Sequence, residues 1–108
     1  MLEFFETSVF TRQIVNLLSD SAYAELQAVL SVDPEAGDLV PGTGGLRKIR
    51  WRHEQRGKGK RSGIRVIYYW HDASGRIYML VAYSKDQRDD LTAQQKRVLK
   101  HLVREELQ

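Results

Sequence analysis

Apolar positions near the start of the chain change from a strand-like run to helical spacing. Residues 2–6 form a short run rich in phenylalanine that predicts a strand. From residue 7 or 8 to about residue 18, apolar residues recur at helical spacing, namely Phe10, Ile14, Leu17 and Leu18. This spacing predicts a first helix.

A second helix is predicted directly after the first. Either Ser19 or Asp20 can cap its N-terminus, because their side-chain oxygens accept hydrogen bonds from free backbone N–H groups. Its apolar stripe consists of Tyr23, Leu26, Val29 and Leu30. Pro34 ends the helix, since proline disfavours helical geometry in the residue before it. We expect the two helices to form a hairpin that packs on a sheet.

Residues 46–52 alternate between the two faces of a predicted strand. One face carries Ile49 and Trp51, and the other carries Leu46, Lys48, Arg50 and Arg52. The flanking segments predict loops. Residues 36–45 are rich in glycine and contain a proline, and residues 53–63 are basic and contain glycine.

Residues 64–71 and 76–84 predict a β-hairpin joined by a short turn. If His71 opposes Arg76, one face of the hairpin is wholly apolar or aromatic and belongs to the core. This face consists of Ile64, Val66, Tyr68, Trp70, Ile77, Met79, Val81 and Tyr83. The opposite, mixed face consists of Arg65, Ile67, Tyr69, His71, Tyr78, Leu80, Ala82 and Ser84.

The chain ends in a predicted helix. Thr92 and Gln95 match a capping box, and the expected buried stripe consists of Val98, Leu99, Leu102 and Val103. Sequential strands joined by short turns are antiparallel. The element order β-α-α-β-β-β-α therefore predicts an α+β fold, with a mostly antiparallel sheet of about four strands. The length of 108 residues corresponds to one domain, residues 1–108.

Composition narrows the class of protein. The chain has no cysteine, which excludes a disulfide scaffold, thiolate zinc sites and a thiol nucleophile. No apolar run approaches the roughly 18 residues of a membrane span. The N-terminus lacks the basic start and apolar stretch of a signal peptide. We expect a cytoplasmic protein without a membrane partner.

Positive charge is concentrated in one part of the chain. The formal net charge is +3, yet residues 46–65 contain nine Lys or Arg residues and one acid. The remaining residues carry a net charge of −5. Such a concentration usually marks a polyanionic partner, namely nucleic acid, an anionic membrane or an acidic protein. The alternative is a solvated basic surface without a partner.

The sequence offers little for metal or nucleophile chemistry. His53, His71 and His101 lack the spacing of metal ligands, and Asp89 and Asp90 fit a helix start better than a metal site. There is no Gly-x-Ser-x-Gly elbow, and the glycine- and lysine-containing loop lacks the spacing of a P-loop. We expect neither a catalytic metal nor a cofactor.

Seven basic side chains are expected to converge at one end of the sheet. They are Lys48, Arg50, Arg52, Lys60, Arg61, Arg65 and Lys85. Crowded cations repel one another, so a bound anion would make this arrangement favourable. An RNA phosphodiester fits, because its own 2′-hydroxyl is the nucleophile and the protein need only position groups and stabilise charge.

Three segments carry a resemblance to a known family. They are VPGTGGLRKIRW at residues 40–51, GKRSGIRVIYY at residues 59–69 and YSKDQRDDLT at residues 83–92. Over essentially its whole length the sequence resembles the RelE/HigB toxins of bacterial toxin–antitoxin pairs, and the first two segments resemble the HigB-like branch. The resemblance implies a small α+β protein that cleaves mRNA at the ribosomal decoding site. It also implies a cognate antitoxin with a helix-turn-helix DNA-binding domain.

The resemblance implies catalytic roles for four residues. Lys48 and Arg50 match two basic residues at alternate positions of a strand, and Arg65 matches an arginine near the start of the next. Lys85 matches a basic residue after the last strand, unless the match shifts by one to Asp86 and this residue is lost. We assign RNA contacts to the other candidates, which are Arg52, Lys58, Lys60, Arg61, Tyr69 and His71.

One position departs from the family. The RelE branch has a tyrosine near its C-terminal helix, where this sequence has Leu91 and Thr92. Tyr69 and His71 lie on the predicted face of Arg65 and are candidates to replace it.

The implied mechanism needs no metal. The 2′-hydroxyl attacks the adjacent phosphorus, Arg65 stabilises the developing charge, and Lys48 or Lys85 transfers a proton.

Two other functions stay open. The ParE branch shares the fold and inhibits DNA gyrase by binding, although the basic face argues against it, and a third possibility is a plain nucleic-acid-binding module.

Overall fold

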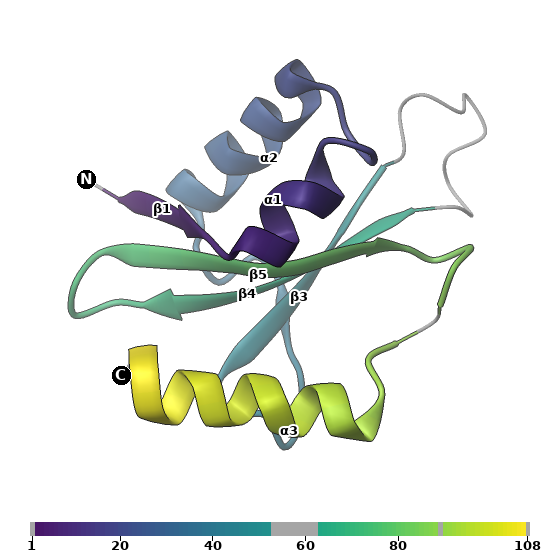
Figure 1. The fold of residues 1–108 in the computed structure, drawn as a ribbon. Coiled ribbons are helices and arrows are strands. Elements are labelled where there is room, and N and C mark those ends of the chain that lie inside the picture. The colour runs from purple at the N-terminus through teal and green to yellow at the C-terminus, as the bar shows by residue number, and fades with distance from the viewer. Residues whose placement is uncertain (1, 53–62, 89, 108) are drawn as a thin grey trace.

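The computed structural model describes residues 2–52, 63–88 and 90–107 (Figure 1). Its five-stranded sheet has the order β1-β5-β4-β3-β2. The strands are β1 (Glu3–Glu6), β2 (Asp38–Leu39), β3 (Leu46–Trp51), β4 (Ile64–His71) and β5 (Arg76–Ser84). The helices are α1 (Ser8–Ile14), α2 (Asp20–Val32) and α3 (Ala93–Leu102), which continues into a π-helical segment, Val103–Leu107.

The predicted α+β fold is confirmed, and the predicted elements follow one another in the predicted order with one additional strand, β2. β1 pairs in parallel with β5, and the other neighbours in the sheet are antiparallel. The helices α1 and α2 cover one face of the sheet, and α3 covers the other (Figure 1). The added strand β2 lies within the predicted loop at 36–45 and pairs with Arg47 and Lys48 of β3.

Side-chain caps determine where the helices begin. The Thr7 hydroxyl accepts a hydrogen bond from the backbone N–H of Phe10, and the Ser19 hydroxyl accepts one from Ala22. Thr92 and Gln95 form the predicted capping box at the start of α3. These contacts satisfy backbone donors that have no partner inside a helix.

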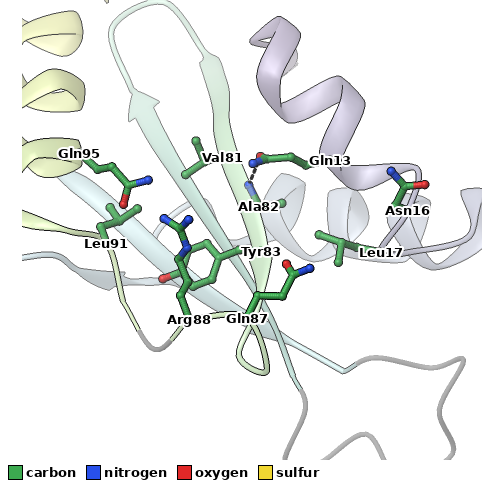
Figure 2. Close-up of a pocket in the computed structure, with 10 residues that line it drawn as sticks. All are labelled: Gln13, Asn16, Leu17, Val81, Ala82, Tyr83, Gln87, Arg88, Leu91 and Gln95. Carbon is green, nitrogen blue, oxygen red and sulfur yellow. Dashed lines mark hydrogen bonds between the residues drawn. The ribbon is translucent and has the colours of Figure 1, made fainter.

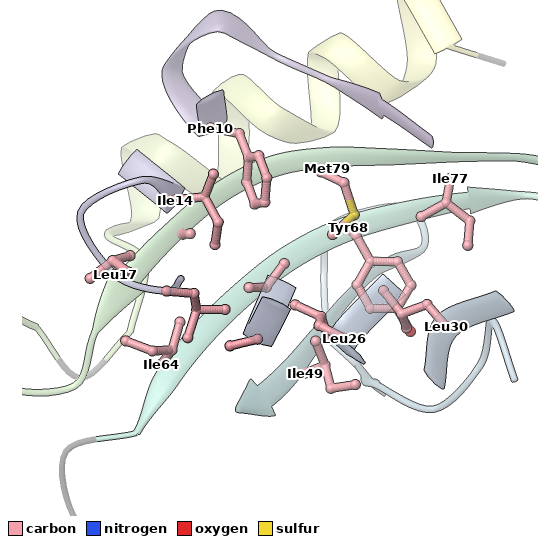
Figure 3. Close-up of a cluster of buried hydrophobic side chains, with 14 residues drawn as sticks. Phe10, Ile14, Leu17, Leu26, Leu30, Ile49, Ile64, Tyr68, Ile77 and Met79 are labelled. Carbon is pink, nitrogen blue, oxygen red and sulfur yellow. The ribbon is translucent and has the colours of Figure 1, made fainter. Parts of the chain in front are cut away.

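The sheet separates two clusters of buried apolar side chains. The first lies beneath α1 and α2, and its large members include Phe10, Leu26, Leu30, Tyr68 and Met79 (Figure 3). The second lies between the other face and α3, and it includes Leu46, Ile67, Tyr69, Leu80, Tyr83, Leu99 and Val103. Two predictions about the helix stripes are wrong, because Val29 is 40% exposed and Val98 is 60% exposed.

An extra residue in β5 changes which side chains share a face. Tyr68 pairs with Met79, whereas the preceding residue, Ile67, pairs with Val81, so Leu80 has no partner position in β4. This is a β-bulge, in which two residues of one strand oppose one residue of its neighbour. The Thr7 hydroxyl donates to the carbonyl of Leu80 at 2.7 Å and holds the bulge against the start of α1.

Because of the bulge, the predicted faces of β5 are wrong from Val81 onwards. Val81 and Tyr83 belong to the cluster beneath α3, on the side of Arg65, and Ala82 belongs to the cluster beneath α1 and α2. The backbone N–H of Ala82 donates to Oε1 of Gln13 at 2.8 Å. The expected register between His71 and Arg76 is correct, so the difference begins at the bulge.

In the described part of the chain, no helix is both long enough and apolar enough to cross a membrane.

Candidate functional site

Two arginines face each other across neighbouring strands. Arg50 of β3 and Arg65 of β4 are directly paired in the antiparallel register. Arg50 is exposed, whereas Arg65 is only 9% exposed. Among the described residues, neither guanidinium forms a hydrogen bond or an ion pair. Like charges in directly opposite positions are destabilising, so this arginine pair is suited to an anion that lies between the two groups.

A glycine lies against the buried arginine. A Cβ atom at Gly63 would be 2.8 Å from Nη1 of Arg65, so only glycine leaves the guanidinium its present position. The Gly63 carbonyl accepts a hydrogen bond from the backbone N–H of Lys85 at 3.0 Å. This bond brings the start of the segment after β5 to the end of the sheet where the arginine pair lies.

Tyr83 lies on the same side of the sheet as Arg65. It is 5% exposed, and its hydroxyl is buried without a hydrogen-bond partner in the described part of the chain. The guanidinium of Arg88 lies 5.9 Å from the centre of its ring. Burial and the charge of Asp90 raise the pKa of Tyr83, although Arg65 and Arg88 oppose the shift. The phenol therefore keeps its proton at neutral pH, and its O–H group has no acceptor among the described residues.

Tyr83 was not among the predicted site residues, because the alternation along residues 76–84 predicted it on the opposite face of the sheet. Leu80, Val81 and Ala82 are all apolar, so the alternation of polar and apolar residues contains no sign of the bulge. No other sequence signal singles out this tyrosine.

Asp90, which precedes α3, forms ion pairs with one lysine of β3 and one lysine of α3. Its carboxylate lies 3.6 Å from Nζ of Lys48 and 3.5 Å from Nζ of Lys96. Partial burial favours the neutral acid, but a hydrogen bond from the Leu91 N–H and the two lysine charges lower the pKa of Asp90. Lys48 is thus held beneath the segment that precedes α3, on the same face as Arg50.

The other predicted site residues are divided between two ends of the sheet. Arg52 directly follows β3 and is exposed, as is Lys85 after β5. Tyr69 is buried in the cluster beneath α3, and Nδ1 of His71 lies 2.6 Å from the Ser74 hydroxyl at the hairpin turn. Tyr69 and His71 thus lie four and six positions beyond Arg65 along β4, away from the arginine pair. Lys58, Lys60 and Arg61 lie outside the described residues.

The candidate site contains basic groups and a phenol but no ligand set for a metal. Across residues 2–52, 63–88 and 90–107, no three His, Asp or Glu side chains are grouped so that they could hold an ion. The arrangement can bind an anion, donate a hydrogen bond to it and stabilise added negative charge.

Comparisons with known proteins identify the fold. No protein-family model matches the sequence. Among solved structures, the chain is similar to a mutant of the E. coli toxin RelE in the free state, with a TM-score of 0.53. The match covers 82% of this chain and 87% of that chain at 13% sequence identity. At this identity the similarity concerns the fold alone, and the chain therefore has a RelE-like fold.

Proposed function

We propose that this protein is the toxin of a bacterial toxin–antitoxin pair, of the HigB-like branch, and that it cleaves mRNA bound to the ribosome. The observation that carries the proposal is the pairing of Arg50 with a buried Arg65 that has no acidic partner among the described residues. A stable fold gains nothing from such a pair, whereas a phosphodiester would neutralise both charges. The RelE-like fold and the resemblance of three sequence segments to RelE/HigB toxins support the same function.

The proposed reaction uses the 2′-hydroxyl of the RNA as the nucleophile. Its oxygen forms a bond to the adjacent phosphorus, and the bond from phosphorus to the 5′-oxygen of the next nucleotide breaks. The 2′-hydroxyl proton passes to a base, and the leaving oxygen takes up a proton. The products are a 2′,3′-cyclic phosphate and a 5′-hydroxyl end.

In this reaction Arg65 stabilises the charge of the pentacovalent phosphorane, and Arg50 holds the phosphate from the opposite strand. Lys48 or Lys85 transfers the protons. Lys60 and Arg61, together with Arg52 and Lys58, contact flanking phosphates. Tyr83 adds a role that the sequence analysis did not assign: its protonated hydroxyl donates to a phosphate oxygen beside Arg65.

The ribosome is part of the proposal because the site is poor in acid–base groups. Lysine and arginine side chains bind phosphate well, but in general they do not exchange protons near pH 7. The proposed site therefore depends on alignment, which contributes roughly 7–11 kcal/mol when the reacting groups are held in line. mRNA fixed in the decoding site provides such alignment, and flexible RNA in solution does not.

The proposed partner in the resting cell is a cognate antitoxin with a helix-turn-helix DNA-binding domain. The antitoxin keeps the toxin inactive, and co-expression of the two proteins is expected to restore growth. The proposed place of action is the cytoplasm, where translating ribosomes are found.

The test is cleavage in a reconstituted translation reaction. Purified protein is added to ribosomes programmed with a defined mRNA, and the breaks are mapped by primer extension. Discrete breaks in phase with codons are expected, and the same RNA without ribosomes should stay intact while binding the protein in a salt-sensitive way. Rapid cleavage of free RNA would contradict the dependence on the ribosome. DNA breaks in cells with intact mRNA would favour the ParE-like alternative.

A further inference from the structure

A polar cavity of about 450 Å³ adjoins the candidate site on the far side of Tyr83 (Figure 2). Cavities that bind small ligands have volumes of about 300–1,000 Å³, so this cavity is large enough for one. It lies between the end of α1, strand β5 and the start of α3. Four carboxamide side chains line it, namely Gln13, Asn16, Gln87 and Gln95.

Three of these amides are fixed by one hydrogen bond each. Oε1 of Gln13 accepts from the Ala82 N–H at 2.8 Å, and Oε1 of Gln95 accepts from the Thr92 N–H at 2.9 Å. Nδ2 of Asn16 donates to the carbonyl of Arg12 at 3.3 Å.

The other ends of the fixed amides have no hydrogen-bond partner among the described residues. Gln13 and Gln95 each keep an NH₂ donor, and Asn16 keeps its oxygen as an acceptor. The side chain of Gln87 forms no hydrogen bond with a described residue, so both its donor and its acceptor are free. The existing hydrogen bonds of Gln13, Asn16 and Gln95 thus determine which end of each amide is left free, and whether that end is a donor or an acceptor.

An aromatic ring and a guanidinium group also line the cavity. The Tyr83 ring forms one wall, and the Arg88 guanidinium lies 5.9 Å from the centre of that ring. Aromatic rings and guanidinium planes are the groups on which nucleobases stack in single-stranded RNA recognition. None of the described residues that line the cavity is acidic, and Arg88 brings a positive charge to the lining.

We propose that this cavity, which we call the amide pocket, binds one nucleobase of the RNA substrate, next to the phosphate held by the arginine pair. The amide ends read the hydrogen-bonding edge of the base, as asparagine and glutamine do in other nucleic-acid complexes. Tyr83 connects the two sites, because it lines the amide pocket and is paired with Arg65 in the antiparallel register of β4 and β5. The inference deepens the proposed function and rests on it for the identity of the ligand as RNA.

The experiment separates the base from the phosphate. Uniformly ¹⁵N-labelled protein is titrated with each of the four ribonucleosides and, separately, with ribose 5-phosphate, and the side-chain and backbone amide resonances are followed. At least one nucleoside is expected to shift the side-chain amide resonances of Gln13 and Gln87. Ribose 5-phosphate is expected to shift resonances around Arg50 and Arg65 and to leave those of Gln13 unchanged.

Two variants test the amide groups directly. Gln13→Glu keeps the oxygen that accepts a hydrogen bond from the Ala82 N–H, but it replaces the free NH₂ donor with a second oxygen. Nucleoside binding should therefore weaken about tenfold. Gln87→Ala removes an amide that forms no hydrogen bond with a described residue and should also weaken binding. Ala28→Glu, at an exposed position of α2 outside the pocket, controls for the added charge and should bind as the original protein does.

The outcomes distinguish the two proposals. If no nucleoside shifts the pocket resonances, or if the shifts persist in both variants, the amide pocket is not a base site. If nucleosides bind but ribose 5-phosphate leaves Arg50 and Arg65 unaffected, the base site stands and the phosphate site of the proposed function fails.

Discussion

A methyl group on Gly63 would lie 2.8 Å from Nη1 of Arg65, closer than real Cβ atoms approach another atom. The atom it would meet is the far end of a long side chain, so the guanidinium can move while the backbone stays in place. We therefore expect Gly63→Ala to reduce cleavage and to leave the midpoint of urea unfolding nearly unchanged.

Gly37→Ala is the matched control for this substitution. A Cβ atom at Gly37 would lie 2.9 Å from the Tyr68 ring and 3.0 Å from the backbone of Lys48, neither of which can move freely. This variant should lose stability. If Gly63→Ala cleaved as efficiently as the original protein, the position of the Arg65 guanidinium would not matter for the reaction.

Arg65→Met should separate activity from stability. Loss of one charge-stabilising donor typically lowers the rate by about 10²–10³. Removal of the repulsion between Arg50 and Arg65 should meanwhile raise the free energy of unfolding by a few tenths to about 1 kcal/mol. Growth arrest on induction and chemical denaturation measure the two effects. Arg97→Met, at an exposed position of α3, should change neither, and an Arg65→Met protein that still arrests growth would refute the site.

Tyr83→Phe removes a hydroxyl that has no hydrogen-bond partner among the described residues. The free energy of unfolding should not decrease, because no hydrogen bond is lost. Cleavage should decrease about tenfold, since a neutral donor to the phosphate is lost.

Tyr68→Phe provides the comparison. The Tyr68 hydroxyl donates to the Pro34 carbonyl at 2.7 Å and accepts from the Gly37 N–H at 2.9 Å. Its removal should cost roughly 1–3 kcal/mol of stability, with cleavage by the folded protein retained. Equal losses of stability in both variants would contradict the role given to Tyr83.

Asp90→Asn should show a pH-dependent loss of stability. Because the pKa of Asp90 is lowered in the folded protein, its charge stabilises the fold above the ordinary value of 3.8. This contribution to stability is lost as the pH falls below 3.8 and then through the lowered pKa that Asp90 has in the folded protein. The group is partly exposed, so the difference at pH 7 should be only about a few tenths of a kcal/mol.

Urea unfolding at pH 7 and at pH 3 measures this difference. It should be present at pH 7 and smaller at pH 3. Asp72→Asn, at the exposed hairpin turn, is the control, because Asp72 forms no ion pair with a described residue. A difference that increased in acid would contradict the ion pairs of Asp90 with Lys48 and Lys96.

Chelation should not affect the proposed reaction, because every proposed catalytic group is a protein side chain or the RNA itself. Ribosomes need magnesium, so the protein alone is treated with a chelator, freed of it and then added to untreated ribosomes. Cleavage should proceed at the original rate. Loss of cleavage that only zinc or manganese restores would contradict the mechanism.

The strict alternation of residues 46–51 was sufficient to predict that Lys48 and Arg50 share a face. The short turn between the strands was likewise sufficient to predict that His71 pairs with Arg76. Tyr83 was placed on the wrong face because the bulge follows from contacts with residues far away in the sequence. The Thr7 hydroxyl holds the Leu80 carbonyl across 73 positions of the chain, and no local pattern encodes that bond.

The amide pocket and the ion pair of Asp90 with Lys48 could not be predicted for a similar reason. Exposed glutamine and asparagine residues look like ordinary solvated residues until another element is placed beside them. Likewise, β2 is only two residues long and owes its strand geometry to Arg47 and Lys48 of β3, not to its own propensity.

The parallel pairing of β1 with β5 determines how late in its own synthesis this chain can finish folding. Glu3 pairs with Arg76, and Thr7 bonds to Leu80, so the first strand has no partner until β5 has left the ribosome exit tunnel. Closing so long a loop is entropically costly, and nearly the whole chain must be present before its contacts can form. Tyr83 emerges with the same segment as these partners. A nascent copy therefore cannot assemble the candidate site until most of its sequence has been translated.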